Sequence, residues 1–464
     1  MLAWMSGVFI GSRFFVSEKI IFIWLIALGI GGIFRKRWGI GAIIVIGIFL
    51  AGVLRMNHSL DTYQRVRDNL IDQDTYQVVV DSSARIRSYG MQYQVIDRQT
   101  GARYFLTTRS GKYKYGQVVA AKGNLSYPEN PAIQRYLLGK NIHSYVSARD
   151  GQVIGEECSL WCQSLRSIQS FKEWFMNLID RAYPGRVGEF LKGILVGYTD
   201  TLPEETKEAF RRTGVTHILA VSGYNVSIFV VLIYQSMLNW QIHRRYSALL
   251  TILVVGIFTL MTGAEASIIR ASLFASILLV GEVMRRYASG WYPLLLCASI
   301  MLAVNPTYIA YDIGFQLSFL AVIGLMLYGN LFDTFSQGLP ALTLKSLIGE
   351  TVAAQIMVLP ILVYHFGEFS VISILANALI VPLIPLAMLW GFVSSILYSL
   401  IPVPVFTVPL ELLIESLIFI NQTVANVPWA MLEVPSIEIW QVGVSYLILG
   451  FLGWLPIRYR HHHV

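Results

Sequence analysis

The sequence predicts an all-α polytopic membrane domain that carries a small, inserted extracytoplasmic β-barrel. The chain has 464 residues, of which 55% are hydrophobic and 14% are charged, whereas about 25% of the residues in soluble domains are charged. Uncharged runs of membrane-spanning length dominate the second half, and a polar stretch of roughly 100 residues interrupts the first half. These three observations exclude a single soluble globule.

Crossing the hydrocarbon core of a bilayer takes about 20 apolar residues. Five uncharged runs each suit one span, namely residues 218–242, 246–264, 287–311, 313–332 and 439–457. The run 369–410 is long enough for two spans or for broken helices. Two shorter runs, 20–34 and 39–54, flank a basic turn at 35–37, which places that turn in the cytoplasm and the following residues outside. The same bias places the basic clusters at 243–245, 285–286 and 458–460 in the cytoplasm.

The polar region after the first hairpin shows period-2 alternation typical of strands. Its strand-like segments are residues 76–80, 92–96, 104–108, 117–123 and 144–148, the last after a short helix. Five short strands fit an OB-fold-like barrel, a fold that commonly binds single-stranded nucleic acid; a sandwich is the alternative. We therefore divide the chain into N-terminal membrane helices (1–55), the OB-like domain (56–165), amphipathic or interfacial helices (166–215) and a transmembrane domain (216–464).

A hairpin within the polar region interleaves basic and aromatic residues: Arg109, Lys112, Tyr113, Lys114 and Tyr115. Binding of a single strand uses cations on phosphates and aromatic rings under bases, so this pattern predicts a nucleic-acid contact. The alternative is a solvated hairpin whose tyrosines pack across strands.

Three cysteines exclude a disulfide-dense scaffold and a Cys-rich metal site. Cys158 and Cys162 would lie within disulfide range if their segment is helical or turned, and an oxidising outer compartment would favour the bond. Closing so short a loop would make it a local clip. A pair of free thiols is the alternative, and no metal site is expected.

Two helices precede the long apolar runs. Residues 187–198 carry apolar and polar groups on opposite faces of a helix. This pattern is typical of an amphipathic helix at the membrane interface. Residues 203–212 carry a starting proline, acidic groups in the first turn and arginines in the last, followed by Gly214. So charged a helix belongs outside the hydrocarbon.

The most specific segment is THILAVSGYNV at residues 216–226, which opens an apolar run with small and polar groups. Further segments follow in order: SIIRAS (267–272), NP (305–306), DIGFQLSF (312–319) and LANALIVP (375–382), with NP (130–131), YL (136–137) and GKNI (139–142) upstream. Together they resemble the signature of the ComEC family, the competence DNA-uptake channels of bacterial membranes.

This resemblance implies a channel, not an enzyme, for single-stranded DNA in the bacterial cytoplasmic membrane, with no cofactor. Many members carry a metallo-β-lactamase-like domain, and the sequence has neither an H-x-H-x-D-H pattern nor a G-x-x-x-x-G-K-[ST] motif. We expect a separate receptor, a nuclease and a cytoplasmic ATPase as partners, besides membrane lipid. The residues expected along the DNA path are Arg270, Gln316, Asn225, Ser222, His217 and Asn377.

Arg270 is the strongest single candidate, because a charge within a span is costly and usually faces the bundle interior or water. It would contact DNA phosphates. The structural alternative is a salt bridge to Glu265, but five residues along one helix separate the two by about 140°.

His217 and Ser222 also permit an intramembrane hydrolase, in which histidine activates a serine nucleophile. On a continuous helix these two would lie about 140° apart, which favours packing or pore lining. Gln316, one turn after Asp312, and Asn377, near two prolines, would line a path beside a broken helix or satisfy an ordinary kink. A small-molecule secondary transporter is a further alternative, although the sequence shows no internal repeat.

Overall fold

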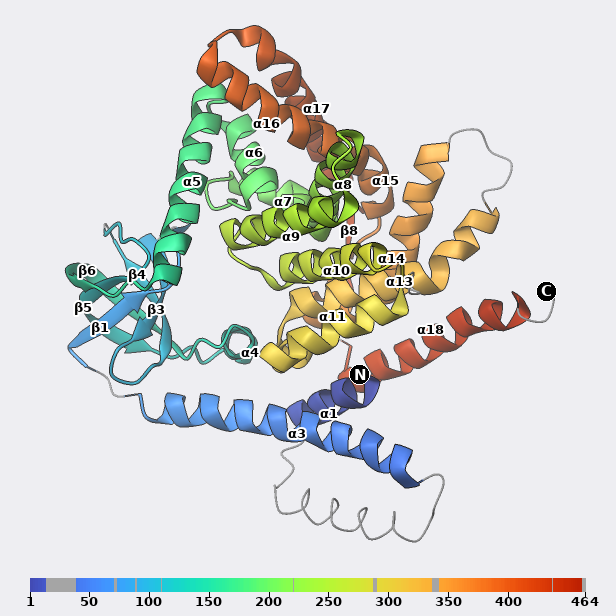
Figure 1. Cartoon of the computed structure of the whole chain (residues 1–464), viewed down its shortest axis with the longest axis horizontal. Coiled ribbons are helices and arrows are strands. Elements are labelled where there is room, and N and C mark those ends of the chain that lie inside the picture. The colour runs from blue at the N-terminus through green and yellow to red at the C-terminus, as the bar shows by residue number, and fades with distance from the viewer. Residues whose placement is uncertain are drawn as a thin grey trace. The chain divides into compact units, whose positions relative to one another are not determined.

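The computed structural model describes residues 1–13, 39–70, 73–87, 90–109, 111–219, 221–286, 290–335, 342–435 and 437–460. These residues form two compact units (Figure 1). The first unit comprises Met1–Gln169 and Ser276–Phe315, and the second comprises Ser170–Ala275 and Gln316–Val464. The predicted apolar run 20–34, the basic turn 35–37 and the last four residues lie outside the described residues.

A closed five-stranded barrel lies in the first unit. Its strands are β1 (Thr75–Val80), β3 (Gly90–Asp97), β4 (Arg103–Thr108), β5 (Gln117–Ser126) and β6 (Ser144–Glu156). They pair in the cyclic order β1-β3-β4-β6-β5-β1, with β4 and β6 parallel and the other pairs antiparallel. The short strand β2 (Arg85–Arg87) adds to the edge of β3. The five predicted strands are thus confirmed, as is the fold class of a helical chain carrying a small barrel.

Alternation of side chains places one face of each strand in the barrel core. In β1, for example, Tyr76, Val78 and Val80 are buried while the residues between them are more exposed. The core also contains Tyr93, Leu106, Val119 and Val146. The barrel therefore buries its apolar groups inside and presents charged groups outside.

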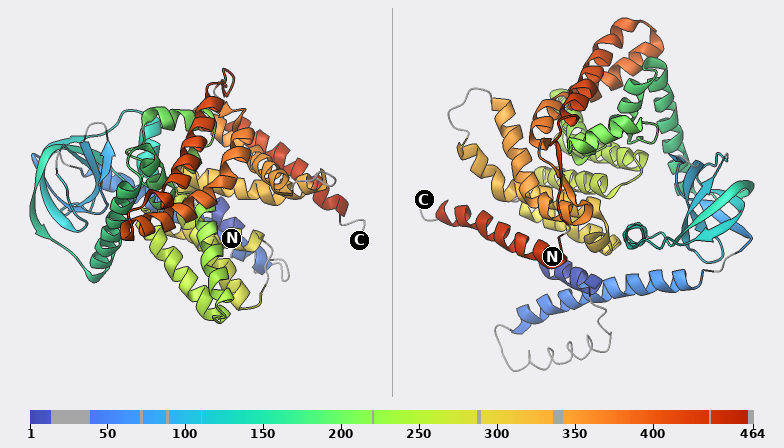
Figure 2. Two further views of the ribbon diagram at one scale, coloured as in Figure 1. Left: turned by 90° about the horizontal axis from the view of Figure 1, so that it is seen from above. Right: turned by 180° about the vertical axis from the view of Figure 1, so that it is seen from behind.

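Strand register gives the barrel two distinct ends. We call the end where β4 stops and β5 begins the basic end, and the end that carries α4 (Pro131–Gly139) the docking end. Helix α4 stands away from the strands (Figures 1 and 2).

The docking end packs on helices of the same unit. Tyr63 of α3 (Gly39–Asp68) donates a 2.7 Å hydrogen bond to the Ile142 carbonyl and stacks on His143 at 4.7 Å. Lys140 Nζ lies 3.6 Å from Asp312 Oδ2, and Asn305 Nδ2 donates to the Gly139 carbonyl at 3.5 Å. The sequence motif at 139–142 therefore meets two others in space, NP at 305–306 and the first residue of DIGFQLSF at 312.

The membrane helices of the first unit begin with α1 (Leu2–Arg13), which packs along α3. A methyl group on Gly7 would lie 1.9 Å from the Phe49 carbonyl oxygen, so only glycine permits this close approach. Helices α11 (Trp291–Val304) and α12 (Tyr308–Tyr311) complete the unit. Helices α5 (Leu160–Ala182), α10 (Ala266–Val283) and α13 (Ile313–Phe335) each contribute to both units.

The second unit is helical apart from the short strand pair β7 (Glu368–Ser370) and β8 (Met431–Glu433). Its other elements are α6 (Arg186–Val196), α7 (Glu204–Arg212), the 3₁₀ turn η1 (Thr216–Ile218), α8 (Gly223–Asn239), α9 (Arg244–Met261), α14 (Leu342–Phe366), α15 (Ser373–Ile380), the 3₁₀ turn η2 (Val381–Leu383), α16 (Ile384–Leu400), the 3₁₀ turn η3 (Pro404–Phe406), α17 (Val408–Ala425) and α18 (Ile439–Arg460). Five described segments are long and apolar enough to cross a membrane: Arg244–Met261, Ala266–Val283, Ile348–Phe366, Ser373–Leu400 and Val408–Ala425. The chain is therefore a multi-pass membrane protein.

Three sequence expectations need correction. The predicted span 218–242 is not one helix, because the backbone is 3₁₀ at η1 and non-helical before α8. Helix α6 is not an exposed interfacial helix: both its faces are buried, and the cation of Lys192 is accommodated by Asp180 at 2.8 Å and Glu189 at 3.1 Å. Asp312 is not on the helical face of Gln316 but caps α13, accepting a 2.7 Å hydrogen bond from Phe315 N–H.

Two other expectations hold. Helix α7 begins after Pro203 and ends before Gly214, as its charge pattern predicted. The 3₁₀ turn η2 interrupts the helical path of the run 369–410 at Pro382, as expected of a broken helix.

Candidate functional site

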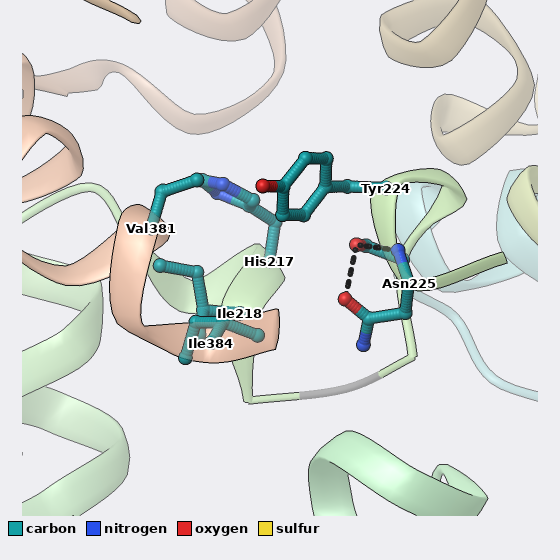
Figure 3. Close-up of a pocket in the computed structure, with 7 residues that line it drawn as sticks. His217, Ile218, Tyr224, Asn225, Val381 and Ile384 are labelled. Carbon is teal, nitrogen blue, oxygen red and sulfur yellow. Dashed lines mark hydrogen bonds between the residues drawn. The ribbon is translucent and has the colours of Figure 1, made fainter. Parts of the chain in front are cut away.

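A small pocket of about 50 Å³ lies in the second unit where the backbone unwinds before α8 (Figure 3). Its lining combines four polar side chains with three apolar ones: His217, Ser222, Tyr224, Asn225, Ile218, Val381 and Ile384. The apolar side comes from η1, η2 and the first turn of α16, so two 3₁₀ turns together line the side of the pocket opposite Asn225 of α8. Irregular backbone at membrane depth is tolerated where it is enclosed by protein or lines a cavity.

Ser222 begins α8 as its N-cap. Its Oγ accepts a 3.4 Å hydrogen bond from Asn225 N–H and donates to Asn225 Oδ1 at 3.2 Å. The buried Asn225 amide donates at 3.1 Å to the Ile194 carbonyl of α6. These two polar residues therefore fix the start of α8 against α6.

His217 lies on the other side of the pocket and is hydrogen-bonded to the Gly214 backbone. Figure 3 shows its imidazole facing the Tyr224 hydroxyl, whereas Ser222 is hydrogen-bonded to Asn225. The expected separation of about 140° between His217 and Ser222 does not apply, because this segment is unwound and not a continuous helix. Even so, no hydrogen bond joins His217 to Ser222 among the described contacts.

Arg270, in the first turns of α10, reaches the start of α8. A methyl group on Gly223 would lie 2.8 Å from Arg270 Nη2, so glycine leaves room for the guanidinium. The guanidinium also lies over the Phe319 ring of α13, 5.9 Å from its centroid. The fold thus places a cation beside the positive end of α8, next to the pocket-lining residues Ser222 and Tyr224.

Gln316 and Asn377 are not among the residues that line this pocket. Gln316 Oε1 lies 3.1 Å from Nε2 of His365 in α14, forming a polar pair between two apolar helices. The side-chain oxygen of Asn377 in α15 is buried, and no described residue donates a hydrogen bond to it. Sequence reasoning missed His365, Tyr224 and Phe319, because only spatial proximity distinguishes them from other polar or aromatic residues in apolar runs.

The basic end of the barrel brings together cations from the connection between β4 and β5 and from β6. Arg109, Lys112 and Lys114 are exposed, as predicted for the hairpin. The Arg109 N–H bonds the Arg149 carbonyl at 3.1 Å, so the exposed Arg149 of β6 lies next to Arg109. Sequence reasoning missed Arg149, which is 40 positions away along the chain.

The tyrosines of the hairpin are engaged by the barrel itself. Tyr113 is 9% exposed, and its hydroxyl both donates to the Gly151 carbonyl at 3.0 Å and accepts from the Gly151 N–H at 2.8 Å. Tyr115 donates to Asp81 Oδ1 at 2.7 Å, and burial raises its pKa. The expectation that Tyr113 stacks on bases is therefore wrong, since its ring belongs to the core.

Cys158 and Cys162 are joined by a disulfide that lies under the turn at Gly116. The Arg166 guanidinium of α5 donates to the Tyr115 carbonyl at 2.9 Å beside it. The clip therefore ties the start of α5 to the hairpin that carries the basic residues. No cluster of three or more metal-ligating side chains occurs among the described residues.

Comparison with known proteins gives one family match. The model of the family described as "Competence protein" matches residues 194–459, more than half of the chain. Two curated relatives are "ComE operon protein 3" of Bacillus subtilis (strain 168), 29% identical over 68% of this chain, and "Uncharacterized protein YcaI" of Escherichia coli (strain K12), 24% identical over 54%. The chain spans 38% of the length of the first relative and 33% of the second. No solved structure matches.

Proposed function

This chain belongs to the competence protein family, and we propose that it forms the membrane channel through which single-stranded DNA enters the cell during natural transformation. The barrel would face the outside of the cytoplasmic membrane and the helices would carry the strand across. A separate receptor, a strand-degrading nuclease and a cytoplasmic ATPase would act with it.

The observation that carries this proposal is the position of Arg270. A guanidinium within a membrane helix is costly and is retained where it meets an anion, a partner or water. Here it lies beside the N-terminus of α8, whose dipole also attracts anions. The Arg270 guanidinium and the positive end of α8 therefore lie side by side, and together they favour the binding of a phosphate group as the strand passes.

The size and lining of the pocket beside Arg270 favour part of a transport path over a binding site for a small-molecule ligand. At about 50 Å³ it is far smaller than the roughly 300–1,000 Å³ of ordinary ligand pockets. Its polar groups come from an unwound segment, where a shift of a few backbone torsions would widen the opening. In this proposal Gln316 with His365, and Asn377, are further polar positions along the route.

The basic end of the barrel would receive the DNA. Arg109, Lys112, Lys114 and Arg149 are exposed cations that can contact phosphates, and such contacts bind without sequence preference. Because Tyr113 belongs to the core, this contact would rest on charge more than on stacking by the hairpin.

The proposed path is tested by photo-crosslinking in cells that take up DNA. A benzoylphenylalanine replaces Tyr224, which lines the pocket, or Phe419, a control that is exposed on the membrane helix α17. Labelled incoming DNA should crosslink at position 224 and not at position 419. Crosslinking at 419 alone would place the strand outside the pocket and overturn the proposed route.

The orientation is tested separately with a membrane-impermeant maleimide on intact cells. Cysteine at Arg109 should react from outside, whereas cysteine at His243 should react only after the membrane is opened. The reverse pattern would place the barrel in the cytoplasm.

A hydrolase is the second candidate, and one observation disfavours it. The Ser222 hydroxyl is held by Asn225 as a helix cap, while His217 faces Tyr224. A covalent serine probe that labels Ser222, with loss of labelling in His217→Ala, would revive it.

A further inference from the structure

The part of α5 within the second unit exposes two aromatic side chains. Phe171 is 51% exposed and Trp174 is 53% exposed. They are three residues apart, so they lie on one face of the helix, and their ring centroids are 5.4 Å apart. They form a continuous aromatic surface that we call the α5 aromatic pair.

The surrounding helix is amphipathic. Glu173 is exposed on a different face from the α5 aromatic pair, about 160° from Phe171 and about 100° from Trp174 around the helix. An apolar stripe containing tryptophan opposite a polar face is typical of helices that lie at the boundary between lipid headgroups and acyl chains.

The neighbouring residue shows what lies beside the aromatic pair. Phe175 is 4% exposed and packs on Phe392 of α16, with ring centroids 5.5 Å apart. Phe392 is itself 42% exposed, on the membrane-spanning segment Ser373–Leu400. Leu389, one turn earlier, is exposed as well. The α5 aromatic pair therefore borders the apolar outer surface of a membrane helix.

The contact lies toward one end of the membrane segment. Phe392 is eight residues before the end of α16, about 12 Å along the helix axis. Because the membrane-spanning segment ends at Leu400, the α5 aromatic pair lies toward the end at which this helix leaves the hydrocarbon.

We propose that the α5 aromatic pair inserts into the lipid bilayer at the boundary between headgroups and acyl chains, beside Phe392. The occupant of this surface is lipid and not a protein partner. The anchor would fix α5 at a defined depth, independently of any DNA contact.

The test places a fluorescent NBD label in the full-length protein, held in nanodiscs of phosphatidylethanolamine and phosphatidylglycerol with one protein per disc. Single cysteines replace Phe171 or Trp174, and Glu173 for the polar face. Cys297 is buried and Cys158 and Cys162 are bonded, so the unsubstituted chain is the labelling blank. Quenching is measured with doxyl-labelled lipid and with aqueous iodide.

Labels at 171 and 174 should be quenched by doxyl lipid and protected from iodide, and the label at 173 should show the reverse. Quenching of 171 and 174 by iodide would place the pair in water and overturn the proposal. Protection from both quenchers would mean that protein covers the pair, which also overturns it. Two labelled positions allow the test if one variant fails to fold.

Discussion

The basic end of the barrel and the pocket of the helical unit hold the same type of cation in opposite surroundings. Arg109 and Arg149 are exposed on a barrel whose core is complete without them. Arg270 lies inside a membrane helix, against a glycine and a phenylalanine that leave it room. An exposed arginine has little effect on the free energy of folding. An arginine within the membrane raises the free energy of the folded protein unless a partner group or water stabilises its charge, so it is retained for a function or a partner.

This difference predicts that DNA binding at the barrel and DNA transport through the helices depend on different cations. Loss of a surface cation should weaken capture in a salt-dependent way, because phosphate contacts release counterions. Loss of the intramembrane cation should leave capture intact and reduce transport. We expect four effects, given from the largest to the smallest. Those at Arg270, in the pocket and at the basic end test that separation, and the one at His143 tests the stability of the barrel itself.

Replacing Arg270 with alanine should reduce DNA uptake per inserted molecule by about 10- to 100-fold, the worth of a hydrogen bond to a charged group. Lysine should restore uptake only in part, because it lacks the planar guanidinium that lies over Phe319. The matched control is Arg286→Ala, an exposed arginine just beyond the same helix. Normal uptake combined with a lower melting temperature would make Arg270 a structural residue and break the comparison.

Acid should destabilise the barrel through His143. Burial lowers the pKa of His143 to about 4, whereas the unfolded chain titrates near 6.5. Above pH 6.5 both states are neutral and stability is unaffected. Between pH 6.5 and 4 only the unfolded state takes up the proton, so stability falls as pH falls, by about 3 kcal/mol at most.

His143→Gln keeps an acceptor for the Arg103 N–H, which bonds His143 Nδ1 at 3.1 Å, but cannot titrate in this range. The measurement is amide-exchange protection in β4 and β6, corrected for the intrinsic pH dependence of exchange. An equally steep pH dependence in the variant would assign the effect to other groups.

Within the pocket, Asn225→Ala should lower stability by about 1–3 kcal/mol, because it leaves the buried Ile194 carbonyl without its donor. Tyr224→Phe should leave the melting temperature unchanged while reducing uptake, since the hydroxyl faces His217 across the pocket. Thermal unfolding in detergent, measured beside uptake, distinguishes the two roles. Equal melting shifts in both variants would make the pocket purely structural.

At the basic end, the double variant Arg109→Gln/Arg149→Gln should lower the magnitude of the salt slope of single-strand binding by about 1.4 units, or 0.7 per cation. The control removes two exposed cations near the docking end, Lys122→Gln/Arg135→Gln, and should leave the slope unchanged. Binding is measured on the full-length protein in nanodiscs. Equal slopes for both variants would mean that the barrel attracts DNA only through its overall charge.

The sequence predicted the barrel well because its information is local. Period-2 alternation sets which side of each strand is buried, and the five strands appear close to the predicted positions. The charge pattern likewise fixed both ends of α7. The spans in α14 and α17 were harder to see from uncharged runs, since Glu350 interrupts one and Glu411 and Glu415 the other.

The sequence by itself determined that this is a membrane protein with an inserted barrel, because composition and periodicity follow from burial in lipid or in a β core. It also singled out Arg270, since a charge within an apolar run is visible without coordinates. Only the tertiary structure decided that Arg270 meets the start of α8, that Tyr113 is a core residue and that Arg149 joins Arg109. Such pairings depend on how distant segments pack, and no local preference of the chain encodes them.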